Sequence, residues 1–161
     1  MNRVNKNMIP EQETLGIRIR PMTREDIPAV AALEQKSFSE PWSEKGFEDA
    51  LLGRQNIFLA AVGKEGLLTG YIGLYGSFDE GEITNVAVAE EFRGQGIGFL
   101  LVESMKKLAS FQGIRKIFLE VRVSNEAARA LYGKAGFEAC GLRKNFYREP
   151  VEDAILMRVV I

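Results

Sequence analysis

The chain has 161 residues, of which 46% are apolar, so it is long enough to bury the core of one domain. Lysine and arginine together number 21 and aspartate and glutamate 22, which excludes a strong overall field for holding a polyanion. No stretch is long and apolar enough to cross a bilayer. We therefore expect a cytoplasmic protein with neither a nucleic acid nor a membrane as partner.

The sequence contains no histidine and a single cysteine, Cys140. One thiol excludes an intrachain disulfide and any metal site made of several thiolates, and we expect this thiol to be buried and inert. Without histidine, Ser-His-Asp and Cys-His catalysis and His-rich metal centres are excluded as well. Acid–base chemistry therefore falls to Glu, Asp, Lys or Tyr, and we expect no metal.

The predicted elements begin after a polar stretch, residues 1–16, which we expect to be a flexible tail. Alternation in "IRIR" predicts a first strand from Ile17. Two helices follow, one opened by Thr23 and one capped by Ser43 and ended at Gly53. Three apolar runs, "NIFLAAVG", "LLTGYIGLYGSF" and "GEITNVAVA", then predict a meander of antiparallel strands.

The second half of the chain predicts two helices and three strands. A glycine-rich segment opens a helix that puts Ile97, Leu101 and Met105 on one apolar stripe. The strand "RKIFLEVRV", a helix "NEAARALYGKA" and two strands, "FEACGLRK" and "EDAILMRVVI", follow, with residues 145–153 connecting the last two. This order predicts an α/β domain over residues 17–161, with a mixed sheet and helices on both faces.

The segment "EEFRGQGIGFL" places Gly94, Gly96 and Gly98 where a helix begins, with no Ser, Thr, Asp or Asn to cap its first amides. Free amides at a helix N-terminus bind phosphate oxygens, and Arg93 adds a charge-assisted contact. A P-loop is excluded because no Lys-Ser or Lys-Thr pair follows. A dinucleotide site stays an alternative, since G-x-G-x-x-G fails only at its third glycine and Glu120 follows downstream. A tight turn without any ligand is the other alternative.

A third phosphate-binding pattern, R/Q-x-x-G-x-G/A after an apolar strand, is met by residues 93–98 after "NVAV". On these residues the chain resembles the GNAT family of acetyl-CoA-dependent N-acetyltransferases. The elements "EPWSEKGF", "FLEVRVSNEAARALYGKAGF" and "RKNFYREPVEDAILM" resemble its members that acetylate protein N-termini. The resemblance implies the GNAT fold with a mostly antiparallel sheet, acetyl-CoA as cosubstrate, and the alanine N-terminus of a small-subunit ribosomal protein as partner.

Tyr132 and Asn125 are seven residues apart on one predicted helix, so they share a side about 10 Å apart along its axis. The resemblance implies that Tyr132 donates a proton to the sulfur of CoA and that Asn125 contacts the pantetheine arm or the phosphates. The alternative for Tyr132 is an aromatic anchor with its hydroxyl in solvent. The cofactor site implied by the resemblance comprises Val86, Ala87, Val88, Arg93, Gly94, Gln95, Gly96, Ile97, Gly98 and Asn125.

Glu120 stands in "RKIFLEVRV", where Ile117 and Leu119 alternate onto one face and Glu120 onto the other. We expect this strand to be central, and burial raises the pKa of a glutamate, which makes it a better base. The resemblance assigns Glu120 the role of general base, directly or through a water. The alternative is a half-exposed glutamate paired with Arg122 or Lys116.

An α-amine is the easier nucleophile, because at pH 7 neutralising it costs about 1 to 1.5 kcal/mol, against roughly 4.5 for a lysine. An enzyme acting on lysine or a small amine, a non-catalytic acyl-CoA-binding module and a nicotinamide or flavin enzyme stay open as alternatives. Trp42 either shapes a peptide entrance or packs in the core. Tyr147 resembles a residue of the family's substrate loop.

Overall fold

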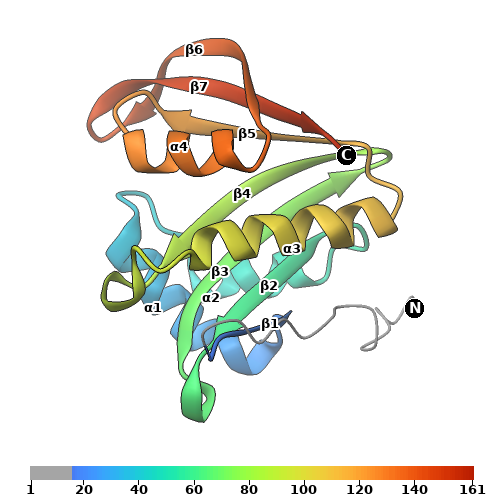
Figure 1. Ribbon diagram of the computed structural model, residues 1–161. Helices are drawn as coiled ribbons and strands as arrows, with labels where there is room; N and C mark the ends of the chain where they lie inside the picture. The colour runs from blue at the N-terminus through green and yellow to red at the C-terminus, as the bar shows by residue number, and fades with distance from the viewer. Residues whose placement is uncertain (1–15) are drawn as a thin grey trace.

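The computed structural model describes residues 16–161, so the predicted tail lies outside the described residues except for Gly16. Within this part of the chain, seven strands form one sheet in the order β1-β2-β3-β4-β5-β7-β6 (Figure 1). Neighbouring strands are antiparallel except β4 and β5, which are parallel. The predicted mixed, mostly antiparallel sheet is confirmed. The strands are β1 (Arg18–Pro21), β2 (Ile57–Val62), β3 (Leu68–Ser77), β4 (Glu80–Val88), β5 (Lys116–Arg122), β6 (Glu138–Arg148) and β7 (Val151–Val160).

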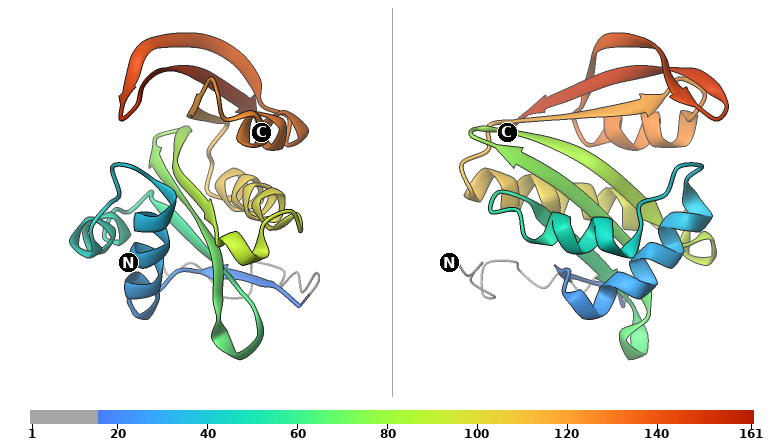
Figure 2. Two further views of the ribbon diagram at one scale, coloured as in Figure 1. Left: turned by 90° about the vertical axis from the view of Figure 1, so that its left-hand side faces the viewer. Right: turned by 180° about the vertical axis from the view of Figure 1, so that it is seen from behind.

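Helices cover both faces of this sheet, as predicted (Figure 2). The α-helices of residues 16–161 are α1 (Ile27–Ser37), α2 (Glu44–Leu51), α3 (Ile97–Phe111) and α4 (Glu126–Lys134). Helices α1 and α2 pack on one face through Val30 and Phe47, whereas α3 packs on the other through Leu101 and Met105. None of these helices is long and apolar enough to span a bilayer.

Ser43 caps α2 as the sequence indicates, whereas Thr23 precedes a 3-10 turn and the N-cap of α1 is Asp26. Ser43 caps α2 by accepting a hydrogen bond from the amide of Gly46 at 3.1 Å. Thr23 opens a short 3-10 turn (Arg24–Asp26) that leads directly into α1. The amide of Thr23 donates to Oδ2 of Asp26 at 2.8 Å, which satisfies one of the free donors at this end.

Strands β4 and β5 pair over a short stretch and then part. Their ladder joins Glu80–Glu82 to residues 116–118, although β4 continues to Val88 and β5 to Arg122. Figure 1 shows β5, β6, β7 and α4 together, set apart from β1 to β4 beyond that ladder. The inner edge of β4 therefore has no strand partner over its last residues within residues 16–161.

The prediction that residues 145–153 connect the last two strands is wrong. Strand β6 continues through "NFYR" to Arg148, and β7 begins at Val151, so only residues 149 and 150 form the turn. The pairing shifts register between Arg143 and Tyr147, where Asn145 has a φ of 51°. Residues that resemble a loop thus form a bulge inside the hairpin, in which residues 144–146 of β6 oppose a single residue of β7, because extra residues can be accommodated without ending a strand.

The expectation of a buried cysteine is also wrong, because Cys140 is exposed. It lies on β6, which among the described strands pairs with β7 alone and so forms the edge of the sheet. Nearly every residue of β6 is exposed, since no described helix or strand covers this end of the hairpin. The sequence "FEAC" shows no sign of this, because its composition equally suits a strand with one buried face.

Candidate active site

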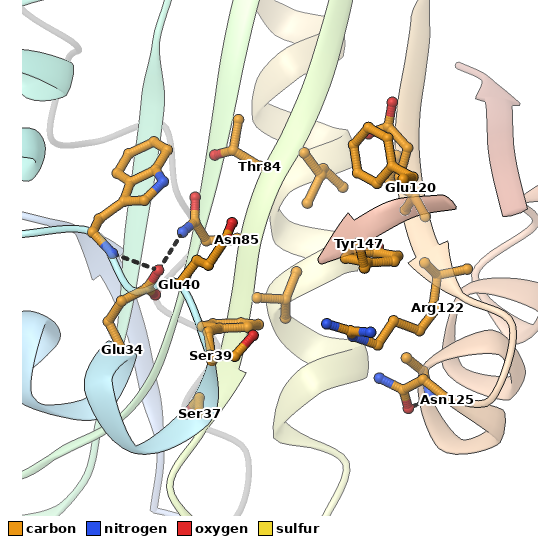
Figure 3. A pocket seen from close by; sticks show the side chains of 18 of the residues that line it. Glu34, Ser37, Ser39, Glu40, Thr84, Asn85, Glu120, Arg122, Asn125 and Tyr147 are labelled. Atoms are coloured by element: carbon orange, nitrogen blue, oxygen red, sulfur yellow. Dashed lines mark hydrogen bonds between the residues drawn. The ribbon is translucent and has the colours of Figure 1, made fainter. Parts of the chain in front are cut away.

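A pocket of about 530 Å³ opens where β4 and β5 part (Figure 3). Its walls come from the end of α1, the α1–α2 connection, β4, β5, α4 and β6. The pocket brings together four of the residues predicted to be catalytic or to bind the cofactor, namely Val86, Glu120, Asn125 and Tyr132. The other lining residues are Glu34, Ser37, Phe38, Ser39, Glu40, Trp42, Ile83, Thr84, Asn85, Leu119, Val121, Arg122, Ala128, Phe146, Tyr147 and Arg148.

Glu120 lies in the middle of β5, and its side chain is 12% exposed. Burial is the largest influence on its carboxyl group and raises the pKa above the ordinary value. A hydrogen bond and the charge of Glu82 on β4 raise this pKa further, whereas Arg143 on β6 lowers it. The net effect is an upward shift of the pKa, which makes Glu120 a stronger base than an exposed glutamate.

The ion-pair partner of Glu120 is not one of those the sequence suggested. Arg122 instead contacts Oε1 of Glu152 through Nη1 at 3.4 Å, while Nε of Arg143 lies 3.6 Å from Oε1 of Glu120. Partners on other strands depend on the register of the sheet, which the sequence alone does not reveal. This is why both Arg143 and Glu82 were missed.

Tyr132 lies on α4, lines the pocket and is 8% exposed as a whole residue. Its ring packs against Phe137, with 5.8 Å between the ring centroids. Burial, and to a smaller extent the charge of Tyr147, raise the pKa of its hydroxyl. The phenol therefore stays protonated at neutral pH and is available as a hydrogen-bond donor inside the pocket.

Asn125 caps α4, because its Oδ1 accepts a hydrogen bond from the amide of Ala128 at 3.1 Å. Figure 3 shows this bond and the amide nitrogen of Asn125 on the opposite side of the group. Capping thus occupies the oxygen of the carboxamide and leaves the nitrogen as the group that a ligand can use.

The glycine-rich segment forms an open turn at the start of α3. Gly94 and Gly96 have φ angles of +78° and +82°, and a Cβ at either position would meet no atom of the described residues within 4 Å. Within residues 16–161 no side-chain hydrogen bond caps this helix, so its first amides lack the partner that a capping side chain would supply. Gly98 has a different role, because its Cβ would lie 3.2 Å from Cδ2 of Leu131, so glycine lets α3 approach α4.

Strand β4 ends beside this turn. The amide of Ala89 donates a hydrogen bond to the carbonyl of Thr69 on β3 at 2.8 Å. Because the backbone groups of successive strand residues point to opposite edges, the amide and carbonyl of Val88 point away from β3, toward the open edge. Arg93 folds back onto that edge, where its Nε donates to the carbonyl of Val88 at 3.0 Å. The backbone of Val86 points to the same edge, where no strand of residues 16–161 pairs with it.

The remaining predicted cofactor residues divide into exposed and buried ones. Gln95 is exposed in the turn, whereas Ala87 and Ile97 are 6% and 3% exposed. The side chains of Ala87 and Ile97 belong to the two core clusters on opposite faces of the sheet. Only their backbone groups can therefore contact a ligand.

Two aromatic residues border the pocket from opposite sides. Trp42 lines it and also packs against Phe47 and Tyr75, with ring centroids 5.3 and 5.7 Å apart, so both of its predicted roles are compatible with the structure. Tyr147 on β6 lies beneath the guanidinium of Arg122, 4.1 Å from the ring centroid. Burial raises the pKa of the Tyr147 hydroxyl.

Sequence reasoning missed two buried polar residues in the wall, Glu34 and Asn85, which are 1% and 5% exposed. A signal for them exists in the sequence. Glu34 directly follows the apolar face of the first helix, and Asn85 interrupts an apolar strand. Charged or amide side chains are seldom fully buried without a partner, so such positions merit attention before a structure is known.

Comparison with known proteins agrees with this architecture. The model of the acetyltransferase (GNAT) family matches residues 27–137. A relative from Bacillus subtilis (strain 168), named as a candidate ribosomal protein bS18-alanine N-acetyltransferase, is 40% identical over 143 residues, which cover 89% of this chain and 95% of the relative.

Two solved structures share the fold. The crystal structure of the ribosomal-protein-S18-alanine N-acetyltransferase from Escherichia coli has a TM-score of 0.82 and 31% identity, covering 90% of this chain and 94% of that one. A chain of the NatC complex bound to Gag peptide and CoA has a TM-score of 0.80 and 25% identity, covering 91% and 99%. The family model spans more than half of the sequence, so the chain belongs to the acetyltransferase (GNAT) family and is an acyltransferase.

Proposed function

We propose that the protein transfers the acetyl group of acetyl-CoA to the N-terminal α-amine of a ribosomal protein whose first residue is alanine. The observation that carries this proposal is the shared pocket of Glu120 and Tyr132, which lies between the open edge of β4 and the hairpin of β6 and β7. The names of the Bacillus subtilis and Escherichia coli relatives support the substrate class.

Acetyl-CoA is the donor, in keeping with the family and with the CoA in the NatC structure. The residues present fit this molecule. The uncapped amides at Gly96 and Ile97 and the free space at Gly94 suit a diphosphate, and the outward polar groups of Val86 suit the amides of the pantetheine arm. The amide nitrogen of Asn125 is a further donor at the pocket wall.

The reaction joins the amine nitrogen to the acetyl carbon and breaks the carbon–sulfur bond. Glu120 takes the proton that the amine must lose, and Tyr132 donates a proton to the departing thiolate. Holding the amine beside the thioester supplies up to about 7 to 11 kcal/mol, so the shape of the pocket contributes as much as the two titrating groups.

The environments of the two residues suit these opposite tasks. The pKa of Glu120 is raised, mainly by burial, which moves a carboxylate base closer to neutral pH. The pKa of Tyr132 is also raised by burial, which keeps the phenol protonated until the thiolate forms. Glu120 is therefore a stronger base than an exposed glutamate, and Tyr132 still carries its proton when the thiolate forms.

Mass spectrometry on matched peptides tests the proposal. One peptide carries the N-terminal sequence of a small-subunit ribosomal protein with a free α-amine and blocked lysines, and the other has a blocked α-amine and free lysines. We expect acetylation of the first peptide alone, fastest with alanine in first position. Modification of the lysine peptide, or binding of acetyl-CoA without thiol release in the presence of any amine, would contradict the proposal.

We also propose that residues 17–161 form the catalytic domain and that the protein acts in the cytoplasm without a nucleic acid or membrane partner. The single sheet that joins β1 to β7 supports the extent of the domain. Expressing residues 17–161 alone tests it, because this fragment should acetylate the same peptide as the full chain.

A further inference from the structure

A buried carboxylate organises the wall of the pocket that faces α1. Glu34 on α1 is 1% exposed and accepts three hydrogen bonds. Its Oε1 accepts hydrogen bonds from the backbone amide of Trp42 at 3.3 Å and from Nδ2 of Asn85 at 2.9 Å. Its Oε2 accepts a hydrogen bond from the hydroxyl of Tyr71. Three donors on one carboxylate satisfy its buried charge, so Glu34 serves as a fixed anchor for its neighbours.

Asn85 is held by this anchor on one side only. Because Nδ2 donates to Glu34, the orientation of the carboxamide is set, and Oδ1 must point the other way, as Figure 3 shows. Within residues 16–161, Oδ1 is a buried side-chain oxygen without any hydrogen-bond donor, although Asn85 is only 5% exposed. Buried acceptors are nearly always paired in native proteins, so this one calls for a ligand group as its donor.

A bulge in β4 brings Asn85 to this place. Gly73 pairs with Asn85 while Leu74 pairs with Ile83, so Thr84 is an extra residue in the β3–β4 ladder. The extra residue reverses the alternation of side chains. Ile83 therefore packs in the core on the α3 side, whereas Asn85 turns toward Glu34 on the α1 side.

Asn85 also lies at the point where the proposed substrates meet. It directly precedes Val86, whose backbone faces the open edge proposed for the pantetheine arm. Its side chain lies in the wall made with Ser37, Phe38 and Trp42, opposite the wall that holds Glu120. None of residues 93–98 lines this pocket, so we assign the wall that holds Asn85 to the peptide rather than to the diphosphate.

We propose that Oδ1 of Asn85 accepts a hydrogen bond from an N–H of the substrate's α-amine and so positions the nucleophile, with Glu34 holding the carboxamide in place. This inference rests on the proposed function. A neutral acceptor suits the task, because a carboxylate at this position would stabilise the ammonium form and hold the amine in its unreactive state. Asn85 thus orients the lone pair, while Glu120 receives the proton.

The test compares Asn85→Ala with a matched control, Tyr71→Phe. Tyr71 is fully buried, donates to the other oxygen of Glu34 and does not line the pocket, so its variant disturbs the same network without touching Oδ1. Steady-state kinetics with the alanine-first peptide, acetyl-CoA affinity by calorimetry and the melting temperature are measured for both. We expect Asn85→Ala to lower kcat/KM for the peptide about tenfold or more at unchanged acetyl-CoA affinity.

We expect Tyr71→Phe to lose a comparable part of its thermal stability while its peptide kinetics stay within about twofold of the wild type. Equal kinetic losses in the two variants would overturn the inference, because the effect would then come from the fold. A loss of acetyl-CoA affinity in Asn85→Ala would also overturn it, because the donor would then be an amide of the pantetheine arm. Should the wild-type protein acetylate no peptide α-amine, the proposed function fails first and this inference falls with it.

Discussion

Nε of Arg143 on β6 lies 3.6 Å from Oε1 of Glu120 on β5, so the exposed edge of the sheet supplies the cation that faces the proposed base. The carboxylate of Glu82 acts on the same group from β4. Two charges of opposite sign, carried by two other strands, therefore adjust the pKa of Glu120 in opposite directions, while burial raises it.

These two neighbours predict a pair of opposite shifts in the pH dependence of activity. Glu82→Gln removes a group that raises the pKa of Glu120, so the acidic limb of the kcat/KM profile should move to lower pH. Arg143→Gln removes a group that lowers this pKa, so the limb should move to higher pH. Initial rates between about pH 5 and 9 measure both shifts. Acidic limbs that shift in the same direction in both variants, or in neither, would show that another group provides the base.

Glu120→Gln should lower kcat by about 10² to 10⁴-fold, because the amide cannot accept the proton of the amine. The side chain keeps its size, and the glycine turn lies outside the pocket wall that holds it, so affinity for acetyl-CoA should not change. Single-turnover rates and calorimetry separate the two quantities. Turnover near that of the wild type would remove Glu120 from the role of base.

The order of the elements was predictable from the sequence because apolar periodicity and polar caps are local signals. Ile117 and Leu119 fall on the buried face of β5 and Glu120 on the other, as the alternation indicates. Ser43 caps its helix as expected. Predictions failed at β6, where the exposure of Cys140 depends on which strands lie next to it.

Tyr132→Phe should slow release of the thiol by about 10² to 10⁴-fold, because the phenol is the only group proposed to protonate the leaving sulfur. Phenylalanine preserves the packing against Phe137, so the melting temperature should change little. Thiol release followed with a chromogenic reagent measures the effect. With a second acyl donor whose thiol has a lower pKa than that of CoA, the rate should fall less on substitution, because this thiolate leaves without needing a proton. An equal loss of rate with both donors would remove Tyr132 from the role of acid.

The candidate site was only half predictable, because its chemistry depends on contacts between distant segments. A pattern of a few residues indicates Glu120, Tyr132 and the glycine turn, since each lies within one short segment. The link between Glu34 and Asn85 joins residues 51 positions apart, and its geometry depends on a bulge that no residue type announces. Long-range pairing of this kind follows from register, which apolar periodicity leaves open.

Gly96→Ala should weaken binding of CoA about tenfold or more. An alanine at a φ of +82° is strained by about 1 kcal/mol, and its methyl group would fill the space proposed for the diphosphate. Gly113→Ala is the matched control, because Gly113 has a φ of +91°, equally free space and a place at the opposite end of α3. Both variants should lose similar stability, measured by urea unfolding, but only the first should lose CoA affinity by calorimetry. Equal CoA affinities would contradict the phosphate site.

Glu34→Gln should make the free energy of unfolding less dependent on pH. Burial raises the pKa of Glu34, although the bonds from Trp42 and Asn85 oppose the shift. A carboxyl group with a raised pKa in the folded state contributes most stability below its unfolded pKa of about 4.3 and loses it as pH rises through the folded pKa. The advantage of the wild type over Glu34→Gln should therefore shrink from about pH 4 upward.

Tyr71→Phe should steepen the same decline, because the Tyr71 hydroxyl donates to the Glu34 carboxylate and so favours its charged form. Urea unfolding of the three proteins at matched pH values measures the differences, in which the contributions of all other carboxyl groups cancel. An advantage of the wild type over Glu34→Gln that grows with pH would mean that the donors around Glu34 outweigh its burial. The ionised form of Glu34 would then stabilise the fold, instead of lowering its stability in return for the orientation that it gives Asn85.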